Sequence, residues 1–148
     1  MAKALIVYAT RKNATKSIAE LIAEGMRFGG VEVTVLNVAD VEKMKPDLRS
    51  FDAIVLGAPT YHGEMHPAMK TFLFFAENAN LEGKVGGAFG AYGWSGESAG
   101  RIYETMKNIF KMDMASGPLM LKSAFIGGGI QMAQSYGKEI AKKLGASL

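Results

Sequence analysis

The sequence contains no cysteine and only one tryptophan. The missing cysteines exclude disulfides, cysteine-ligated iron–sulfur clusters, thiolate zinc sites and thiol nucleophiles. Their absence also fits a reducing compartment. No apolar run approaches the roughly 20 residues that a membrane-spanning helix needs. The first apolar stretch, residues 4–9, is too short for a signal peptide. We therefore expect a cytoplasmic protein that does not contact a membrane.

The chain also lacks any tract of five or six clustered basic residues, and its net charge is only +3. A charge this small and this scattered does not indicate a nucleic-acid partner. The length of 148 residues suits one domain. There is no internal repeat, low-complexity tract or linker to divide it. Residues 1–148 are therefore expected to form a single domain.

Apolar runs alternate with helical patterns along the whole chain. Buried strands are expected at residues 4–9, 31–35, 52–58, 84–91 and 119–125. Helices are expected between and after them, with the longest over residues 99–110 and a short helix or loop over residues 40–50. Such alternation implies parallel strands joined by right-handed crossovers, in a three-layer α/β/α sandwich. Many functions share this architecture, so function has to be sought in the loops.

The loop that follows the first strand has the chemistry of a phosphate site. It offers two hydroxyls, one side-chain amide and the backbone N–H groups of a helix N-terminus, all of which favour an anion. Its spacing matches neither the P-loop nor the dinucleotide fingerprint. An ordinary hydrophilic turn, with Asn13 or Thr15 capping the helix, explains the loop equally well. The residues alone leave both interpretations open.

Two further loops leave the same edge of the expected sheet and carry aromatic residues. Residues 58–67 combine a rigid proline start, an aromatic side chain and a glycine, which suits a wall for a flat ring. Residues 90–97 place Tyr92 and Trp94 between glycines. Exposed aromatic side chains need something to pack on. They could pack on each other, but two such loops beside a phosphate loop favour a bound ring.

The second loop also contains His62, Glu64 and His66, which raises the question of a metal site. The pattern is not that of the zincins, and Pro67 prevents one helix from carrying both histidines. A third ligand from elsewhere in the chain would be needed. We therefore expect no metal.

The three loops resemble those of the flavodoxin family, specifically its short-chain type. They are most similar to the flavodoxin domain of the flavodiiron proteins (A-type flavoproteins), here as a stand-alone domain. The resemblance implies a five-stranded parallel sheet of order 2-1-3-4-5 and non-covalently bound FMN. By this resemblance the phosphate is bound by Thr10, Arg11, Lys12, Asn13, Ala14 and Thr15. The flavin ring is bound by Pro59, Thr60, Tyr61, His62, Gly63, Ala91, Tyr92, Gly93, Trp94 and Gly96.

The chain departs from the family pattern in four respects. Asn13 stands where the family usually has glycine, and we expect the turn to survive because asparagine tolerates the left-handed backbone better than most residues. Arg11 and Lys12 place two cations where the family is mostly neutral, and the chain is basic whereas flavodoxins are typically acidic. We expect no diiron domain within these 148 residues, so reduction of oxygen or nitric oxide is not implied for this chain alone.

The predicted function is that of an FMN-containing electron carrier between redox enzymes, rather than a self-contained oxidoreductase. No residue forms an evident nucleophile or acid–base pair, so no catalytic residue is assigned and the chemistry belongs to the flavin. Two alternatives remain: an FMN-dependent NAD(P)H:quinone-type reductase, and a flavodoxin-like module that has lost FMN. The expected partners are redox proteins, among them acidic ones such as a ferredoxin-like donor, or a reductase. The protein itself is expected to be a monomer or weak dimer.

Overall fold

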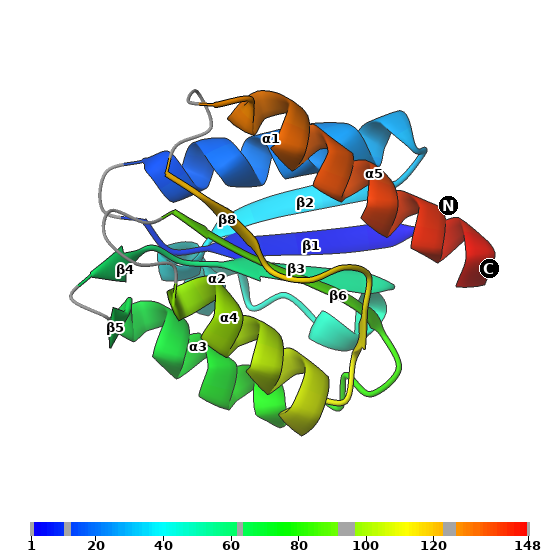
Figure 1. The fold of residues 1–148 in the computed structure, drawn as a ribbon. Helices are drawn as coiled ribbons and strands as arrows, with labels where there is room; N and C mark the ends of the chain where they lie inside the picture. Colours follow the sequence, from blue (N-terminus) through cyan, green and yellow to red (C-terminus); the bar gives the residue numbers. More distant parts are fainter. Residues whose placement is uncertain (1, 11–12, 62–63, 92–96, 123–126, 148) are drawn as a thin grey trace.

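The computed structural model describes residues 2–10, 13–61, 64–91, 97–122 and 127–147. Figure 1 shows three layers, with a central sheet between two groups of helices. Helices α1 (Ala14–Phe28) and α5 (Gly129–Ser147) cover one face. Helices α2 (Val38–Met44), α3 (Pro67–Glu77) and α4 (Glu97–Glu104) cover the other. Within these described ranges no helix is long and apolar enough to span a bilayer.

The sheet is parallel and confirms the predicted strand order. Strands β2 (Glu32–Asn37), β1 (Lys3–Tyr8), β3 (Ala53–Gly57) and β6 (Val85–Ala91) lie side by side in that order. Their pairing is in continuous register, with Ala4 opposite both Val33 and Ala53. Strands β3 and β6 are buried at every position. Continuous apolar runs of this kind are what a sheet covered on both faces requires.

The fifth strand position is occupied by two short strands instead of the single strand predicted at 119–125. β7 (Asp113–Met114) pairs with the start of β6, and β8 (Leu119–Leu121) pairs with its end. Residues 123–126 lie outside the described part of the chain. The prediction missed β7 because two residues carry too little periodicity to reveal a strand.

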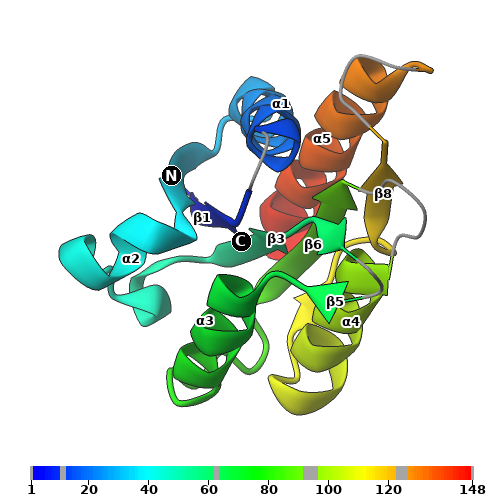
Figure 2. The ribbon, with the colours of Figure 1, turned by 90° about the vertical axis from the view of Figure 1, so that its left-hand side faces the viewer.

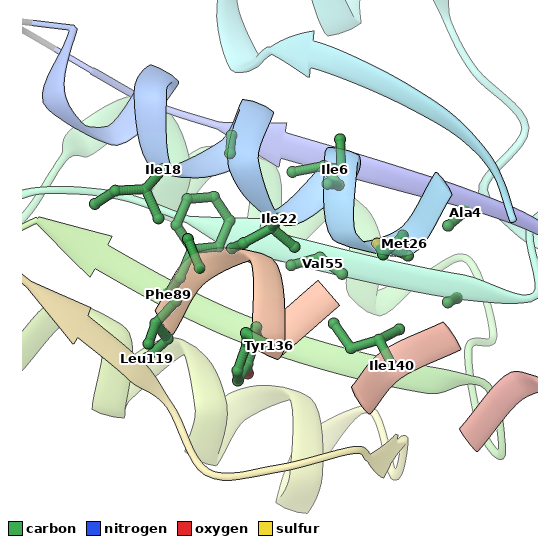
Figure 3. Close-up of a cluster of buried hydrophobic side chains, with 14 of the residues drawn as sticks. Ala4, Ile6, Ile18, Ile22, Met26, Val55, Phe89, Leu119, Tyr136 and Ile140 are labelled. Carbon is green, nitrogen blue, oxygen red and sulfur yellow. The ribbon is translucent and has the colours of Figure 1, made fainter. Parts of the chain in front are cut away.

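A tyrosine hydroxyl fills the gap between β7 and β8. The backbone N–H of Ala88 in β6 donates to the Tyr136 hydroxyl at 3.0 Å, and that hydroxyl donates to the Ala88 carbonyl at 3.1 Å. Tyr136 comes from α5 and is buried (Figure 3). Burial raises the pKa of Tyr136 to about 12, so the hydroxyl keeps its proton at neutral pH. The side chain thus replaces the hydrogen bonds that an unbroken fifth strand would make.

Helices α1 and α5 pack directly on each other over the sheet (Figure 2). Ile18, Ile22 and Met26 of α1 gather with Phe89 of β6 and Ile140 of α5 in one apolar cluster (Figure 3). A Cβ atom built at Gly137 of α5 would overlap the carbonyl oxygen of Ile22, and one built at Gly25 would overlap that of Gln134. The two glycines therefore let the helix backbones touch, which sets the position of α1.

The remaining elements are short. Residues 40–50, predicted as a short helix or loop, form the end of α2 and a 3₁₀ turn at Leu48–Ser50. The helix predicted over residues 99–110 is present as α4 and the π-helical segment Thr105–Ile109 that continues it, but the prediction that it is the longest helix was wrong, because α5 has 19 residues. Lys111 follows with a φ of 56°, a left-handed conformation that a helix cannot continue through.

Candidate functional site

Three loops begin at one edge of the sheet, where the parallel strands have their carboxyl ends (Figure 1). Backbone hydrogen bonds hold these ends together. The N–H of Ala9 donates to the carbonyl of Gly57 at 2.9 Å, and the N–H of Ala58 donates to the carbonyl of Phe89 at 3.3 Å. In open parallel sheets ligands bind beyond this edge, at the point where the strand order reverses. Here that point lies between β1 and β3.

The first loop enters α1 through a left-handed residue. Asn13 precedes the helix with a φ of 62° and a ψ of 1°, which confirms the conformation expected for it. Its carbonyl accepts hydrogen bonds from the N–H and hydroxyl of Ser17, at 3.1 and 3.2 Å. Its side chain makes no capping hydrogen bond. The interpretation of Asn13 as a side-chain cap is therefore wrong, and the asparagine serves the turn through its backbone.

Thr15, in the first turn of α1, carries a buried hydroxyl that lacks a partner. The residue is 0% exposed, and Oγ1 makes no hydrogen bond within the described structure. Leaving a buried hydroxyl unpaired costs roughly 1–3 kcal/mol, so such groups in proteins usually have an explanation. The interpretation of Thr15 as a helix cap is contradicted, because a capping hydroxyl would be bonded to a backbone N–H.

An anionic oxygen would accept hydrogen bonds both from the Thr15 hydroxyl and from the backbone N–H groups at the N-terminus of α1. The first N–H groups of any α-helix have no acceptor inside the helix, and the helix dipole favours negative charge there. The first turn of α1 contains no acidic side chain. The described residues of the first loop therefore fit a phosphate group.

The second loop begins as a small hairpin that the sequence did not predict. β4 (Thr60–Tyr61) pairs antiparallel with β5 (Glu64–Met65). Beyond it, Nδ1 of His66 accepts a hydrogen bond from the N–H of Ala68 at 3.1 Å and so caps α3, whose first residue is Pro67. His66 therefore has a structural role in starting α3. The described residues include no cluster of three His, Asp or Glu side chains able to hold a metal ion.

Comparison with known proteins identifies the family to which the chain belongs. A family model described as a flavodoxin domain matches residues 5–134. The chain belongs to the flavodoxin family. The solved structure of a flavodoxin from the domain Archaea is 32% identical, with a TM-score of 0.87, and the match covers 97% of this chain and 99% of that one. The resemblance seen in the loops, and with it the flavodoxin-like fold, is confirmed.

Other relatives of this flavodoxin domain are much longer proteins. The rubredoxin-oxygen oxidoreductase of Megalodesulfovibrio gigas is 26% identical over 99% of this chain, which spans 37% of that relative. The nitric oxide reductase of Moorella thermoacetica is 30% identical over 97% of this chain, which spans 36% of it. The chain thus spans about a third of the length of these curated relatives. Family membership indicates FMN as the cofactor and electron transfer as the role.

The predicted cofactor-binding residues that the structure describes follow or end neighbouring strands at the carboxyl edge of the sheet. Asn13, Ala14 and Thr15 lie at the start of α1, and Thr10 is the second residue after β1. Pro59 follows β3, Thr60 and Tyr61 form β4, and Ala91 ends β6. The other predicted residues lie outside the described part of the chain: Arg11, Lys12, His62, Gly63, Tyr92, Gly93, Trp94 and Gly96.

Sequence reasoning missed one buried polar residue at this edge of the flavodoxin domain. The hydroxyl of Ser98, in the first turn of α4, donates to the carbonyl of Pro59 at 3.0 Å. Ser98 lies in none of the loops that were singled out, and its partner is 39 positions away. A serine after a glycine-rich loop gives no sign of such a distant contact.

Proposed function

We propose that this flavodoxin domain binds FMN non-covalently and passes electrons between larger redox enzymes. The observation that carries the proposal is the buried, unpartnered hydroxyl of Thr15 at the N-terminus of α1. The left-handed backbone at Asn13 supports it, because the turn survives where the family usually has glycine. When bound, the flavin supplies the electron chemistry, and the protein supplies binding, orientation and charge.

In the proposed site the FMN phosphate is held by residues of the first loop. Thr10 and Thr15 donate hydrogen bonds through their hydroxyl groups. Asn13, Ala14 and Thr15 contribute the side-chain amide of the turn and the backbone N–H groups of the helix N-terminus. Arg11 and Lys12 add positive charge. Charge-assisted hydrogen bonds of this kind are each worth roughly 1.5–3 kcal/mol when they are well formed.

The flavin ring is proposed to lie between the second and third loops. Tyr61 and Trp94 flank the ring, and Tyr92 and Gly93 provide backbone contacts at its pyrimidine edge. The remaining residues proposed to line the ring are Pro59, Thr60, His62, Gly63, Ala91 and Gly96. Aromatic side chains in short loops offer the flat apolar surface that a stacked ring needs.

Trp94 makes the binding of FMN directly measurable, because it is the only tryptophan of the chain. We expect titration of the apoprotein with FMN to quench its fluorescence strongly, since stacking brings the indole and the flavin into contact. Bound flavin should also show its visible absorption. Unchanged tryptophan emission would rule out the placement of Trp94, and a protein that takes up no FMN would point to a module that has lost its cofactor.

Membership of the flavodoxin family implies redox partners in general. We propose further that the partner that reduces this domain is acidic. Exposed cations lie in the first turns of α1 and α3 and just after β8, at the cofactor edge: Lys16, Lys70 and Lys122. Arg101 is an exposed cation in the last turn of α4. Opposite charge on a partner would speed encounter and fix orientation.

The acidic-partner proposal is tested by salt. We expect the rate of reduction by an acidic donor protein, measured by stopped flow, to fall as ionic strength rises, because the Debye length shrinks to about 8 Å at physiological salt. A neutral chemical reductant is the matched control and should show a flat rate. A protein donor whose rate stays constant or increases with salt would contradict the proposal.

A further inference from the structure

Ser98 joins the two segments from which the proposed ring loops extend. Pro59 is the second residue after β3, near the start of the second loop, and Ser98 stands in α4 directly after the third loop. The 3.0 Å hydrogen bond from the Ser98 hydroxyl to the Pro59 carbonyl is buried, and Ser98 is 1% exposed. One side chain therefore links the base of one loop to the end of the other.

The backbone around this link is packed too tightly to adjust easily. A Cβ atom built at Gly90, in β6, would lie 2.7 Å from the carbonyl oxygen of Ala58 and 3.4 Å from the Cβ of Ala99. The end of β3 and the start of α4 therefore both rest directly on the backbone of β6. Contact of this kind fixes the separation of the two segments in one direction, and the Ser98 hydrogen bond fixes their relative position in another.

We propose that Ser98 is a positioning residue for the flavin ring, a role that rests on the proposed function. By holding Pro59 against α4, its hydroxyl sets the spacing of the two loops between which the ring is to be bound. Loss of the hydroxyl would leave a buried carbonyl without this donor and let the loop bases separate. Binding of the ring then carries the entropic cost of ordering the two loop bases again.

The test compares FMN with riboflavin, which lacks the phosphate. In Ser98→Ala we expect the dissociation constants of both ligands to rise by the same factor, roughly five- to thirtyfold for a net loss of 1–2 kcal/mol. The visible circular dichroism of the bound flavin should change as well, because the ring sits in an altered asymmetric environment. Ser98→Thr keeps the hydroxyl and should restore the wild-type constants and spectrum.

Tyr136→Phe is the matched control. It also removes a buried hydroxyl that bonds to backbone atoms, but at Ala88, on a different part of β6. It should lower the urea midpoint of the apoprotein and leave both dissociation constants within about twofold of wild type, because the Tyr136 hydroxyl bonds the edge of β6 that faces β7 and β8, and not the edge that faces β3. Urea titration of each apoprotein shows in addition that it is folded under the conditions of the binding measurement.

Wild-type constants and spectrum in Ser98→Ala would overturn the role of Ser98 while leaving the proposed function intact. Equal losses in Ser98→Ala and Ser98→Thr would also overturn it, because the hydroxyl would then not matter. Should Ser98→Ala not fold, Ser98→Thr decides: wild-type constants support the role, and weakened binding of both ligands rejects it. A wild-type protein that binds neither flavin would instead reject the proposed function, and the role of Ser98 would fall with it.

Discussion

Gly137→Ala is expected to lower the free energy of unfolding by about 3 kcal/mol or more, the upper end of what overpacking costs. The added methyl group would overlap the carbonyl oxygen of Ile22 and lie 2.9 Å from the backbone nitrogen of Met26. Both atoms belong to the backbone of α1, which cannot rotate away as a side chain would. The gain of roughly 1 kcal/mol in helix propensity offsets only part of this cost.

Gly145→Ala provides the control within the same helix. A Cβ atom at Gly145 meets no atom within 4 Å, so only the change in helix propensity remains. We expect this variant to be as stable as wild type or more stable by up to about 1 kcal/mol. Urea unfolding of the two variants measures the difference. Equal stabilities would show that α1 and α5 are not in backbone contact.

The contact between α1 and α5 also matters for the cofactor. Ile22 lies two turns beyond Thr15 on the same helix. A shift of α1 away from α5 would therefore move the hydroxyl and the N–H groups that are proposed to hold the phosphate. The position of the proposed phosphate site is thus set by helix packing on one face of the sheet, and not by the loop alone.

The elements and the layers could be predicted because they depend on long, local signals, whereas the strand order followed from the resemblance to the flavodoxin family. The runs at residues 4–9 and 52–58 are continuous and apolar, and the helices between strands show clear periodicity. The split of the fifth strand could not be predicted. It depends on Tyr136 reaching Ala88, 48 positions away, and on a two-residue strand at Asp113–Met114. Neither feature leaves a pattern in the neighbouring sequence.

The same distinction applies to the site. The left-handed turn at Asn13 was predicted correctly, because it depends on the backbone preference of one residue. Whether Asn13 and Thr15 cap the helix could not be decided from the sequence, since a cap and a ligand site use the same residue types. Only the hydrogen bonds distinguish them. Ser98 was missed because its importance depends entirely on where Pro59 lies.

Thr15→Val is expected to have the largest effect on cofactor binding. Valine has nearly the shape of threonine but lacks the hydroxyl that would donate to the phosphate. Loss of a hydrogen bond to a charged group costs roughly 1.5–3 kcal/mol, so the dissociation constant for FMN should rise about 10- to 150-fold. The apoprotein should be as stable as wild type or more stable, because a buried hydroxyl without a partner is replaced by an apolar group.

The measurement that tests the central claim is the affinity of wild type and Thr15→Val for FMN and for riboflavin, followed through the emission of Trp94. The claim predicts that wild type prefers FMN. It also predicts that Thr15→Val loses affinity for FMN in the range given above while its affinity for riboflavin changes by less than about twofold. Equal affinity of wild type for the two ligands, or equal losses for both in Thr15→Val, would contradict a phosphate site at the N-terminus of α1.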